Sequence, residues 1–407
     1  MSTGLLPKNK GLATMVLDAI SQLRVSPLGF GDLTTDAWGS QKVSLPHSLV
    51  HGLFTFDVPQ TQWFMFHGAT QVYSSSNIVS VDGTGIVTAN AANPVARLES
   101  RVTPRYQPNR GHLFSTAFWM PNKLNDGERD VGLITVENGV FFRLKSDGLL
   151  YACLKSNGIL TREELIDTSG IVDFDVEKGN IYDIQYQWRG VGNYSFYINL
   201  TKVHVFSMLG TLTALSMADP ALPICFKATR ITQDVAIHIG CADITSENGQ
   251  DDRLQYGSVY AAATLNGTSL PLVVVHNPLT TNGKTNTRML ELARISINSD
   301  KKGLMRVWIT RDPTAFTGMT LASVNYGSNV YSDSPDSAVG AVRATAVDLA
   351  KLRLITSVPV QANVTSSVDN PSAARIDFPL ARGDYLVITV TMNTALCDAV
   401  IEYGEAI

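Results

Sequence analysis

Short runs of alternating hydrophobic and polar residues, separated by turn dipeptides, dominate the first 250 positions of the chain. The most regular stretch is 131–166, where apolar runs are divided by Asn138–Gly139, Asp147–Gly148 and Asn157–Gly158. Asn-Gly and Asp-Gly tolerate positive φ at both central positions of a hairpin turn. The pattern therefore predicts a four-stranded antiparallel meander over residues 131–166.

A second hairpin is predicted further along. Apolar residues alternate with polar ones at 182–188, and after a turn at 189–193 the alternation resumes at 194–200. Period-two alternation on both arms predicts strands with one buried face and one wet face. Upstream, residues 113–119 are more continuously apolar, which the interior of a sandwich allows.

The last third of the chain carries further apolar runs of strand length. We expect strands at 270–276, 288–297, 304–310, 350–358 and 384–392. The polar, turn-rich stretch 243–257 has no periodicity, and we place a domain boundary there. Self-similarity at a short fixed period is absent from the sequence, so a propeller or a solenoid is not expected.

Helical periodicity is found near the N-terminus. One apolar stripe at spacings of three and four consists of Leu12, Met15, Val16, Ala19, Ile20 and Leu23. Pro27 and Gly29 end the predicted helix. Two interpretations stay open: the helix packs on its own core, or it is an arm that docks on another subunit.

Together these elements predict an all-β protein of two β-sandwich domains, the first a lectin-like jelly roll, preceded by a short N-terminal helix. The expected parts are a helical arm over 1–33, the jelly roll over 34–250 and a second, smaller β-sandwich over 251–407. A length of 407 residues agrees with more than one domain.

Composition narrows the function classes. The net charge is −4, which argues against nucleic-acid binding as the main activity, because such binding needs a basic face. Charged residues make up 17%, below the usual quarter, and Ser, Thr, Asn and Gly replace them. The sequence has no apolar run of membrane-spanning length, and we expect no signal peptide and no membrane partner.

The four cysteines are predicted to be buried, reduced and separate in space. They are Cys153, Cys225, Cys241 and Cys397, and all lie in apolar or alternating stretches. No pair has the spacing of a redox or zinc motif. We therefore expect synthesis in a cytoplasm and free thiols that behave as small hydrophobic side chains.

A search for catalytic motifs is mostly negative. Nucleophile elbows, phosphate-binding loops and HExxH are absent from the sequence, and the seven histidines are scattered. The acidic loop with Asp243, Glu247, Asp251 and Asp252 is interpreted as a solvated linker, with a Ca²⁺ site as the alternative. We predict no catalytic residue, no metal, no cofactor and no enzymatic activity.

Carboxylates for glycoside hydrolysis need only be neighbours in space, so sequence spacing does not locate them. The nearest candidates are Glu163–Glu164 on a predicted strand and the pair Asp173 and Asp175, all interpreted as solvated. Aromatic residues for sugar stacking are Trp63, Trp119, Trp188 and Trp308, for which burial in a core is the favoured alternative.

Several stretches resemble structural proteins encoded by tailed bacteriophages. These stretches are TTDAWGSQKVSLPHSLVHGLFTFD (34–57), TPRYQPNRGHLFS (103–115), ENGVFFRL (137–144), ADPALPICFKATR (218–230) and ITSENGQ (244–250). They are similar to the family's "TDAFGRLRVS…TLFD", "RYQPNR" and "NPxLPVRYEI…VISEGG" motifs and occur in the same order.

The resemblance implies a non-catalytic component on the exterior of a tailed-phage virion: a capsid decoration or cement protein, a head fibre or a tail-associated protein. A receptor-binding tail-fibre or baseplate module that recognises a host glycan is the alternative. The expected location is the virion, after synthesis in the host bacterial cytoplasm. The expected partners are other virion proteins, copies of the chain itself in a homo-oligomer, and a host-surface glycan in the alternative.

The stretch Arg105–Arg110 has a physical interpretation of its own. Pro104 and Pro108 hold it extended, so its polar side chains either brace strands to a loop or reach a neighbouring subunit. The candidate intersubunit contacts are Leu12, Met15, Val16 and Ile20 on the arm and Arg105, Tyr106, Asn109 and Arg110 on this stretch.

Overall fold

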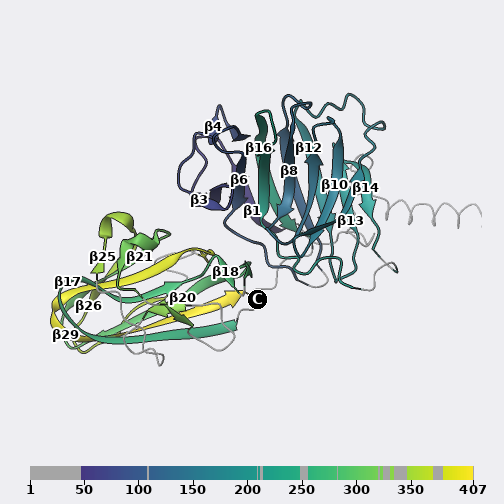
Figure 1. Ribbon diagram of the computed structural model, residues 1–407. Helices are drawn as coiled ribbons and strands as arrows, with labels where there is room; N and C mark the ends of the chain where they lie inside the picture. The colour runs from purple at the N-terminus through teal and green to yellow at the C-terminus, as the bar shows by residue number, and fades with distance from the viewer. Residues whose placement is uncertain are drawn as a thin grey trace, which may run out of the picture. The chain divides into compact units, whose positions relative to one another are not determined.

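The computed structural model describes most of the chain after residue 46. The described residues are 47–406 apart from 108–109, 209, 211–213, 248–254, 282, 320, 324–330, 334–345 and 370–378. The predicted helix within 1–33 lies outside them. Over the described residues, β-strands and two short 3-10 turns, Pro313–Ala315 and Leu349–Lys351, make up the regular structure, which confirms the all-β prediction (Figure 1).

The chain divides into two compact units. The first contains residues up to Ser100 and Tyr106–Asp251, and the second contains Arg101–Arg105 and Asp252–Ile407. The chain thus leaves the first unit for five residues and then returns to it. A contribution of residues 101–105 to the second unit is not visible in the hydrophobic pattern.

One sheet of the first unit contains eight antiparallel strands. Its order is β14 (Thr201–Phe206), β13 (Tyr194–Ile198), β12 (Asn180–Tyr186), β7 (His112–Trp119), β16 (Val235–Ser246), β5 (Thr84–Ala89) and β4 (Ile78–Val81), and β1 (His47–Leu53) also pairs with β16. The predicted hairpin is β12–β13, and the predicted strand at 113–119 is β7.

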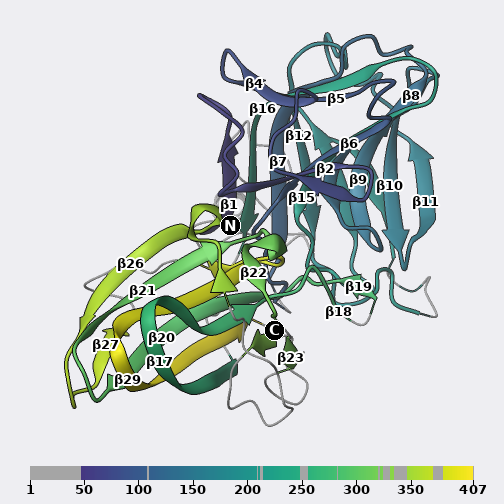
Figure 2. The same cartoon turned by 60° about the vertical axis from the view of Figure 1, so that its left-hand side comes forward.

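The other sheet of this unit also has eight strands. Its order is β11 (Ile159–Leu165), β10 (Leu150–Ser156), β9 (Gly139–Leu144), β8 (Gly127–Ile134), β15 (Ile224–Arg230), β6 (Val95–Ser100), β2 (Trp63–His67) and β3 (Thr70–Val72) (Figure 2). The antiparallel pairs β8–β9, β9–β10 and β10–β11 confirm the predicted meander.

The turns at Asp147–Gly148 and Asn157–Gly158 differ in backbone conformation. Asn157 and Gly158 both have positive φ, 49° and 81°, as the type I′ turn requires. At the turn before it, Gly148 has a positive φ of 76°. Here the glycine supplies the left-handed residue, and Asp147 accepts a hydrogen bond from the Leu149 N–H at 2.8 Å.

Aromatic side chains from both sheets meet between them. Tyr182 stacks on Phe118 of its own sheet with ring centroids 3.8 Å apart, and it contacts Phe142 of the opposite sheet at 5.3 Å. Phe142 also lies edge-on to Phe196 at 5.1 Å. Each such fully buried ring contributes about 1.5–3 kcal/mol, so this layer fixes how the two sheets pack.

The predicted wet face of the β12–β13 hairpin is wrong. Asp183, Gln185 and Gln187, which alternate with the core residues, are exposed by 3% or less. Gln185 donates to Glu247 at 2.6 Å and accepts from the Tyr197 hydroxyl at 3.0 Å. Hydrogen bonding among side chains therefore lets this polar face be buried, which alternation alone does not predict.

Two 22-residue strands organise the second unit. β17 (Gln255–His276) and β29 (Tyr385–Ala406) pair antiparallel over nearly their whole length, with register shifts between Leu265 and Val273. The C-terminal half of β29 also pairs with β20 (Met289–Ser299), and its N-terminal half pairs with β21 (Gly303–Thr310), which pairs in turn with β26 (Arg353–Val360).

Shorter strands complete the second unit. β24 (Tyr331–Asp333) pairs with β17 and with β23 (Ala322–Ser323), whereas β27 (Ser366–Asp369) and β28 (Pro379–Leu380) pair with β20. Two small hairpins are β18 (Thr280–Thr281) with β19 (Lys284–Thr285) and β22 (Phe316–Thr317) with β25 (Ala346–Val347). A separate apolar core includes Val259 and Ile401 together with Met305 and Ile388.

The stretch 243–257, expected to be a loop, is strand at both ends. Residues 243–246 complete β16, and 255–257 begin β17. Backbone pairing with β1, β7 and β29 outweighs the polar side chains there.

An aspartate is buried at the start of β29. Arg101 and Arg311 both donate to Asp384, the latter from Nε at 3.1 Å, and the Ala381 N–H donates at 3.1 Å. Asp384 is fully buried. Arg101 belongs to the five-residue segment that precedes Tyr106, so this ion cluster attaches that segment to the second unit.

The four cysteines are free. Cys153, Cys225 and Cys397 are buried as predicted, but Cys241 is exposed, because it lies on the side of β16 that faces away from the core. Among the described residues no helix is long and apolar enough to span a membrane.

Candidate functional site

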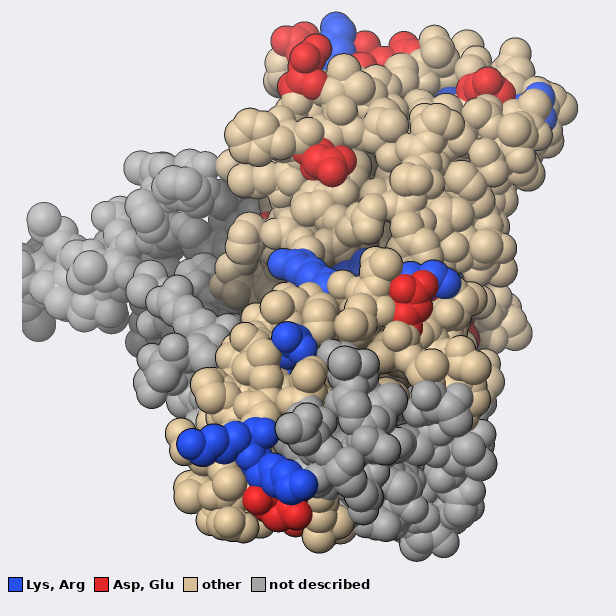
Figure 3. Space-filling model, turned by 90° about the vertical axis from the view of Figure 1, so that its left-hand side faces the viewer, with Lys and Arg blue, Asp and Glu red and all other residues tan. Residues whose placement is uncertain are grey.

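Charge is concentrated on one sheet face of the first unit. In the view of Figure 3, charged side chains stand in small groups among broad uncharged areas. The face of the sheet β11–β10–β9–β8–β15–β6–β2–β3 that points away from the core is different. Its strands place Arg97, Lys227, Asp130 and Arg143 there, and we call this surface the charged face.

Strand register aligns these residues in one row across the sheet. Directly opposed residues are Phe66 and Arg97, Arg97 and Lys227, Lys227 and Asp130, Asp130 and Arg143, and Arg143 and Tyr151. Directly opposed side chains in an antiparallel sheet lie about 5 Å apart at Cβ and interact. Six strands thus contribute one side chain each to a continuous row.

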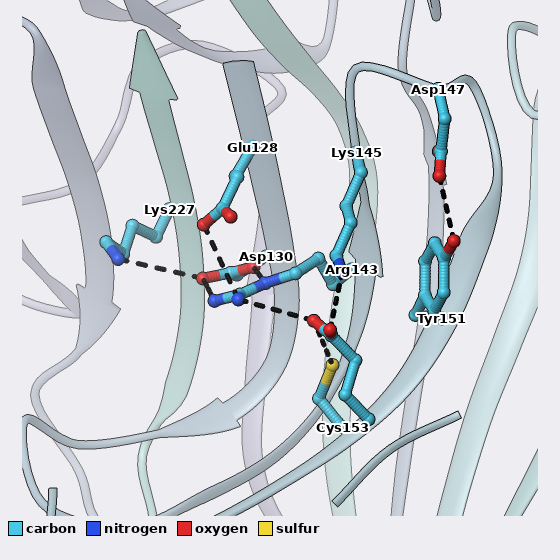
Figure 4. Close-up of polar contacts among 9 residues, drawn as sticks. Glu128, Asp130, Arg143, Lys145, Asp147, Tyr151, Cys153 and Lys227 are labelled. Carbon is cyan, nitrogen blue, oxygen red and sulfur yellow. Dashed lines mark hydrogen bonds and ion pairs between the residues drawn. The ribbon is translucent and has the colours of Figure 1, made fainter. Parts of the chain in front are cut away.

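Arg143 is the centre of the row (Figure 4). It forms a two-pronged contact with Asp130, Nε to Oδ1 at 2.7 Å and a terminal nitrogen to Oδ2 at 3.0 Å. The other terminal nitrogen lies 3.5 Å from Glu128 and 3.6 Å from Glu163. One guanidinium on β9 therefore holds two carboxylates from the neighbouring strand β8 and one from β11, which lies two strands away on the other side.

The same carboxylates have second cationic partners. Lys145 donates to Glu163 at 2.5 Å, and Lys227 lies 3.7 Å from Asp130. Burial alone would lower the pKa of Arg143, but its hydrogen bond to Asp130 and the charges of Asp130 and Glu128 raise that pKa above its ordinary value. The hydrogen bond to Glu163 likewise raises the pKa of Lys145.

An apolar layer lies beneath the charges. Ile134, Phe141, Cys153 and Cys225 form a small buried cluster on this face, with Tyr151 packed against it. The Arg143 guanidinium lies 5.3 Å from the centroid of the Phe141 ring, and Lys145 Nζ lies 4.3 Å from that of Tyr151. Cations that cover aromatic rings in this way keep them from water and hold the charges in place.

Gly132 permits the close packing of β8 against β9. A Cβ at this position would lie 2.5 Å from the Val140 carbonyl oxygen and 2.6 Å from Phe141 Cα. Those atoms belong to the backbone and cannot rotate away. The glycine therefore brings Phe141, and with it the position of Arg143 two residues later, to its observed place.

The charged face remains accessible to solvent. Glu128 and Lys227 are 34% and 32% exposed, whereas Asp130 beneath them is 4% exposed. The face therefore combines outer groups that a ligand can reach with an inner carboxylate held by a fork of N–H donors. Rigidly held donors and acceptors of this kind suit the recognition of adjacent hydroxyl groups.

The carboxylates around Arg143 are also close to one another. Glu128 and Glu163 lie within 3.5 and 3.6 Å of the same nitrogen, so the two oxygens are at most about 7 Å apart. Glycoside hydrolysis uses two carboxyl groups about 5–9.5 Å apart.

One of the carboxylates proposed from the sequence for glycoside hydrolysis lies at this site. Glu163 lies on the charged face, but its neighbour Glu164 points the other way, 3.4 Å from His204 of β14. Asp175 is elsewhere, in contact with Lys123 and Lys178, and Asp173 precedes it in the same loop. The structure therefore separates Glu163 from Glu164, and it places Asp175 away from the charged face.

The tryptophans proposed for sugar stacking lie in packed environments. Trp63 is 1% exposed in the core, and Trp119 packs on His238 with ring centroids 5.2 Å apart. Trp188 donates to the Met217 carbonyl oxygen at 3.0 Å, and Trp308 donates to Thr389 at 2.8 Å. None of these four is part of the charged face.

The predicted intersubunit residues are only partly described. Leu12, Met15, Val16, Ile20 and Asn109 lie outside the described residues. Tyr106 accepts a hydrogen bond from the Arg189 N–H at 3.1 Å and contacts the rings of His112, Tyr186 and Trp188, whereas Arg105 belongs to the second unit and the Arg110 N–H donates to Gln107. These contacts match the brace interpretation of the stretch, and a role between subunits stays a prediction.

The acidic loop proposed as an alternative Ca²⁺ site is divided. Asp243 accepts a hydrogen bond from Ser48 at 2.7 Å, and Glu247 is buried beside Gln185. Asp251 and Asp252 lie outside the described residues. Among the described residues no group of three or more His, Cys, Asp or Glu side chains is placed to hold a metal ion.

The site residues that sequence analysis missed carry a weak local signal. Glu128 and Asp130 are two apart on β8, Phe141 and Arg143 are two apart on β9, and Cys225 and Lys227 repeat this on β15. A charge at every second position of a strand predicts that the residues share a face. This pattern does not show which other strands pair with the strand that carries it.

No known protein family matches the chain, and no curated protein matches it. Solved structures resemble part of it. One, from work on endo-acting O-glycanases with which members of the human gut microbiota initiate mucin breakdown, has a TM-score of 0.39 at 11% identity, and the match covers 49% of this chain and 99% of that one.

Two glucanases give similar values. The endo-β-1,3-glucanase from Pyrococcus furiosus has a TM-score of 0.37 at 11% identity, covering 49% of this chain and 94% of that one. A β-1,3-glucanase from Mycobacterium marinum has a TM-score of 0.36 at 8% identity, covering 49% and 98%. At these values no residue role is transferred to this chain.

Two predictions are corrected here. The expectation of a non-catalytic virion component and the expectation of no enzymatic activity are contradicted, because the similar solved structures are mostly glycoside hydrolases. The first expectation rested on the resemblance to tailed-phage structural proteins, and the second rested on the absence of catalytic motifs. That absence is a poor criterion for this chemistry, because carboxylates from different strands reach one place without any fixed spacing in the sequence.

Proposed function

We propose that the first unit binds a glycan on the charged face. The observation that carries the proposal is the convergence of Glu128, Asp130 and Glu163 on the Arg143 guanidinium, at 2.7–3.6 Å, on a solvent-accessible sheet surface. Sugars present adjacent hydroxyl groups, each of which donates and accepts. Carboxylates accept hydrogen bonds and fixed N–H groups donate them, so a pair of adjacent sugar hydroxyl groups can find both kinds of partner here.

The apolar layer supports the same function. Tyr151 is partly exposed at the end of the row, where its hydroxyl donates to Asp147 at 2.8 Å. A sugar ring has an apolar face as well as its hydroxyl rim, and a fixed aromatic side chain beside polar groups suits both.

Hydrolysis of the bound glycan is a second candidate function. The separation of at most about 7 Å between Glu128 and Glu163 is compatible with a carboxylate pair that acts on a glycosidic bond. Arg143 lies between the two groups, so a substrate would lie over the guanidinium and contact the carboxylates from the solvent side.

The test is binding of the full chain to a panel of laminarin, lichenan, xylan and mucin, by affinity electrophoresis, with release of reducing ends measured in parallel. Glu163→Gln removes one charge of the cluster and should weaken binding at least tenfold. Glu164→Gln changes the next residue, which faces the other way, and should leave binding unchanged. The wild-type protein failing to bind any of these glycans, or equal losses in both variants, would refute the proposal.

The finer details of the fold and setting are proposals as well. We propose that the two sheets of the first unit form a lectin-like jelly roll, which the packing of eight strands on eight supports. The virion location, partnership with other virion proteins and self-association, all implied by the tailed-phage resemblance, also remain proposals. Immunogold labelling of intact particles tests the location.

A further inference from the structure

β11 is an edge strand of the first unit. Among the described residues it pairs only with β10, and it is the last strand of its sheet (Figure 2). The Ile166 N–H, directly after β11, donates to the Leu150 carbonyl oxygen at 2.9 Å. Backbone groups alternate in direction along a strand, so the N–H and C=O of Leu165 point away from the sheet. A strand of another chain can pair with such an edge.

The exposed side chains of β11 distinguish it from the other edge strands of this unit. β11 and β1 have seven residues each, whereas β14, β4 and β3 are shorter. Three aliphatic side chains of β11 are more than a third exposed: Ile159 at 67%, Leu160 at 37% and Leu165 at 54%. Each of the other described edges carries at most one such side chain. β11 also lacks proline and lysine, which commonly prevent edge pairing.

The charges of β11 are self-complementary. Its regular part is 162–165, because Thr161 is an extra residue that bulges opposite β10. Arg162 and Glu164 are each 44% exposed and lie 3.6 Å apart. In an antiparallel pair of two copies centred on Glu163, Arg162 of each copy would lie opposite Glu164 of the other. Two-fold symmetry repeats this favourable pair, so β11 matches itself in charge.

The same register places the two Glu163 side chains opposite each other. Within each chain Glu163 accepts a hydrogen bond from Lys145 at 2.5 Å and lies 3.6 Å from Arg143. The negative charges that meet in this register are therefore already compensated by cations of their own chains.

The register also covers apolar surface. Leu165 would lie opposite Thr161 of the other copy and lose part of its exposure. Glu164 lies 3.4 Å from His204 of β14, so the edge of the opposite sheet lies beside β11. A second copy on β11 therefore meets a surface wider than one strand.

We propose that β11 pairs antiparallel with β11 of a second copy of this chain, so that the sheet continues from one copy into the other. This inference rests on the self-association proposed above and names its surface, and it does not depend on glycan binding. Pairing would supply hydrogen-bond partners to the outward backbone groups of Leu165. Two short strands bury less than a standard interface of about 1,200–2,000 Å², so we expect a dimer that dissociates on dilution.

Sedimentation velocity of the full chain from about 1 to about 100 µM measures this dimer. The dimer fraction should rise with concentration. Hydrogen exchange in the peptide 159–165 should slow as the dimer forms, because its outward N–H groups become paired. A monomer over the whole range, or unchanged exchange in this peptide, overturns the proposal.

Charge reversal tests the register. Arg162→Glu places like charges opposite each other twice and should weaken the dimer by about tenfold. The double variant Arg162→Glu with Glu164→Arg restores opposite charges and should recover the dimer. A dimer that Arg162→Glu leaves unchanged, or that the double variant fails to recover, overturns the proposed pairing.

A matched pair of lysine variants tests the surface. Leu165→Lys places a charge on the edge and should also weaken the dimer by about tenfold. Val172→Lys, at a residue with 85% exposure outside β11, is the control and should leave the dimer unchanged. Circular dichroism and thermal unfolding confirm that each variant is folded. Equal losses in the two lysine variants overturn the surface.

The outcomes separate this inference from the proposals it rests on. A dimer that persists in every β11 variant overturns the role of β11 and leaves self-association intact. Binding to the glycan panel is measured independently, and its failure refutes the proposed function without affecting the pairing of β11.

Discussion

Asp130 and Asp384 are two nearly buried aspartates, each held by arginine, in different units of the chain. Asp130 lies on a sheet face, and its partner Arg143 also contacts Glu128 and Glu163. Asp384 lies in the interior, where Arg101 and Arg311 converge on it. Near solvent, the single arginine Arg143 contacts several carboxylates. In the interior, the single carboxylate of Asp384 contacts two arginines.

The difference separates a site from a structural element. A cation with several carboxylates can lose one of them, or exchange it for a ligand, without being left unpaired. A buried carboxylate between two guanidinium groups cannot, because removing it leaves two charges in a medium that solvates them poorly. Only the first arrangement is suited to reversible binding.

The largest expected effect follows from removing each aspartate. Asp384→Ala should lower the free energy of unfolding of the second unit by about 3–5 kcal/mol, because Arg101 and Arg311 lose their shared carboxylate. Asp130→Ala should cost about 1–3 kcal/mol in the first unit, because Arg143 keeps two carboxylates. Chemical denaturation followed by hydrogen exchange in peptides from β29 and β9 separates the units.

Asp300→Ala, at an exposed position of the second unit, controls for the loss of a charge and should have little effect. Equal losses in Asp130→Ala and Asp384→Ala would contradict the distinction between the two arrangements.

A second test uses acid. Burial lowers the pKa of His112 in the first unit and of His276 in the second to about 4, although in His276 the Asp384 carbonyl opposes this. Each histidine contributes stability that is present above its ordinary pKa of about 6.5 and is lost as the pH falls through 4. From the shift, each loss amounts to about 3 kcal/mol.

In the second unit Asp384 acts in the opposite direction. Burial raises its pKa to about 7, although Arg311 lowers it, so its contribution is full below the ordinary aspartate pKa and is lost as the pH rises through 7. Lowering the pH from 7 to 4 should therefore destabilise the first unit more than the second. Hydrogen exchange at both pH values, corrected for intrinsic rates, measures this, and greater acid loss in β29 than in β7 would contradict it.

The smallest expected effect concerns the support of the charged row. Gly132→Ala places a Cβ against the backbone of β9 and should cost about 1–3 kcal/mol while displacing Arg143 and weakening glycan binding. Gly170→Ala, where a Cβ meets no atom within 4 Å, is the control. Thermal unfolding and affinity electrophoresis of both variants give the comparison, which fails if both behave alike.

The sequence predicted the parts of the fold that depend on neighbouring residues. The meander β8–β11 follows from turn dipeptides at the ends of apolar runs, and each of its strands pairs with the next along the chain. The burial of Gln185 could not be predicted in this way, because its partner Glu247 is 62 positions away.

The candidate site depends on pairings between distant segments. Arg97, Lys227 and Asp130 become neighbours because β15 lies between β6 and β8, although it follows them by about a hundred residues. Alternation on each strand showed which residues share a face, but only the strand order assembles the row. The sequence marks Glu163 as a candidate because a second carboxylate follows it, whereas nothing near Arg143 in the sequence marks that residue as its partner.

Residues 101–105 belong to the second unit although they lie between two segments of the first, so no single cut in the gene separates the two units. A cut after codon 251 would give one product that contains Arg101 and another that contains Asp384, and these two residues form an ion pair in the intact chain. The second fragment would retain a buried carboxylate with one guanidinium instead of two. Modules of this kind cannot be exchanged between genes by a single crossover, so the two units are expected to be inherited together.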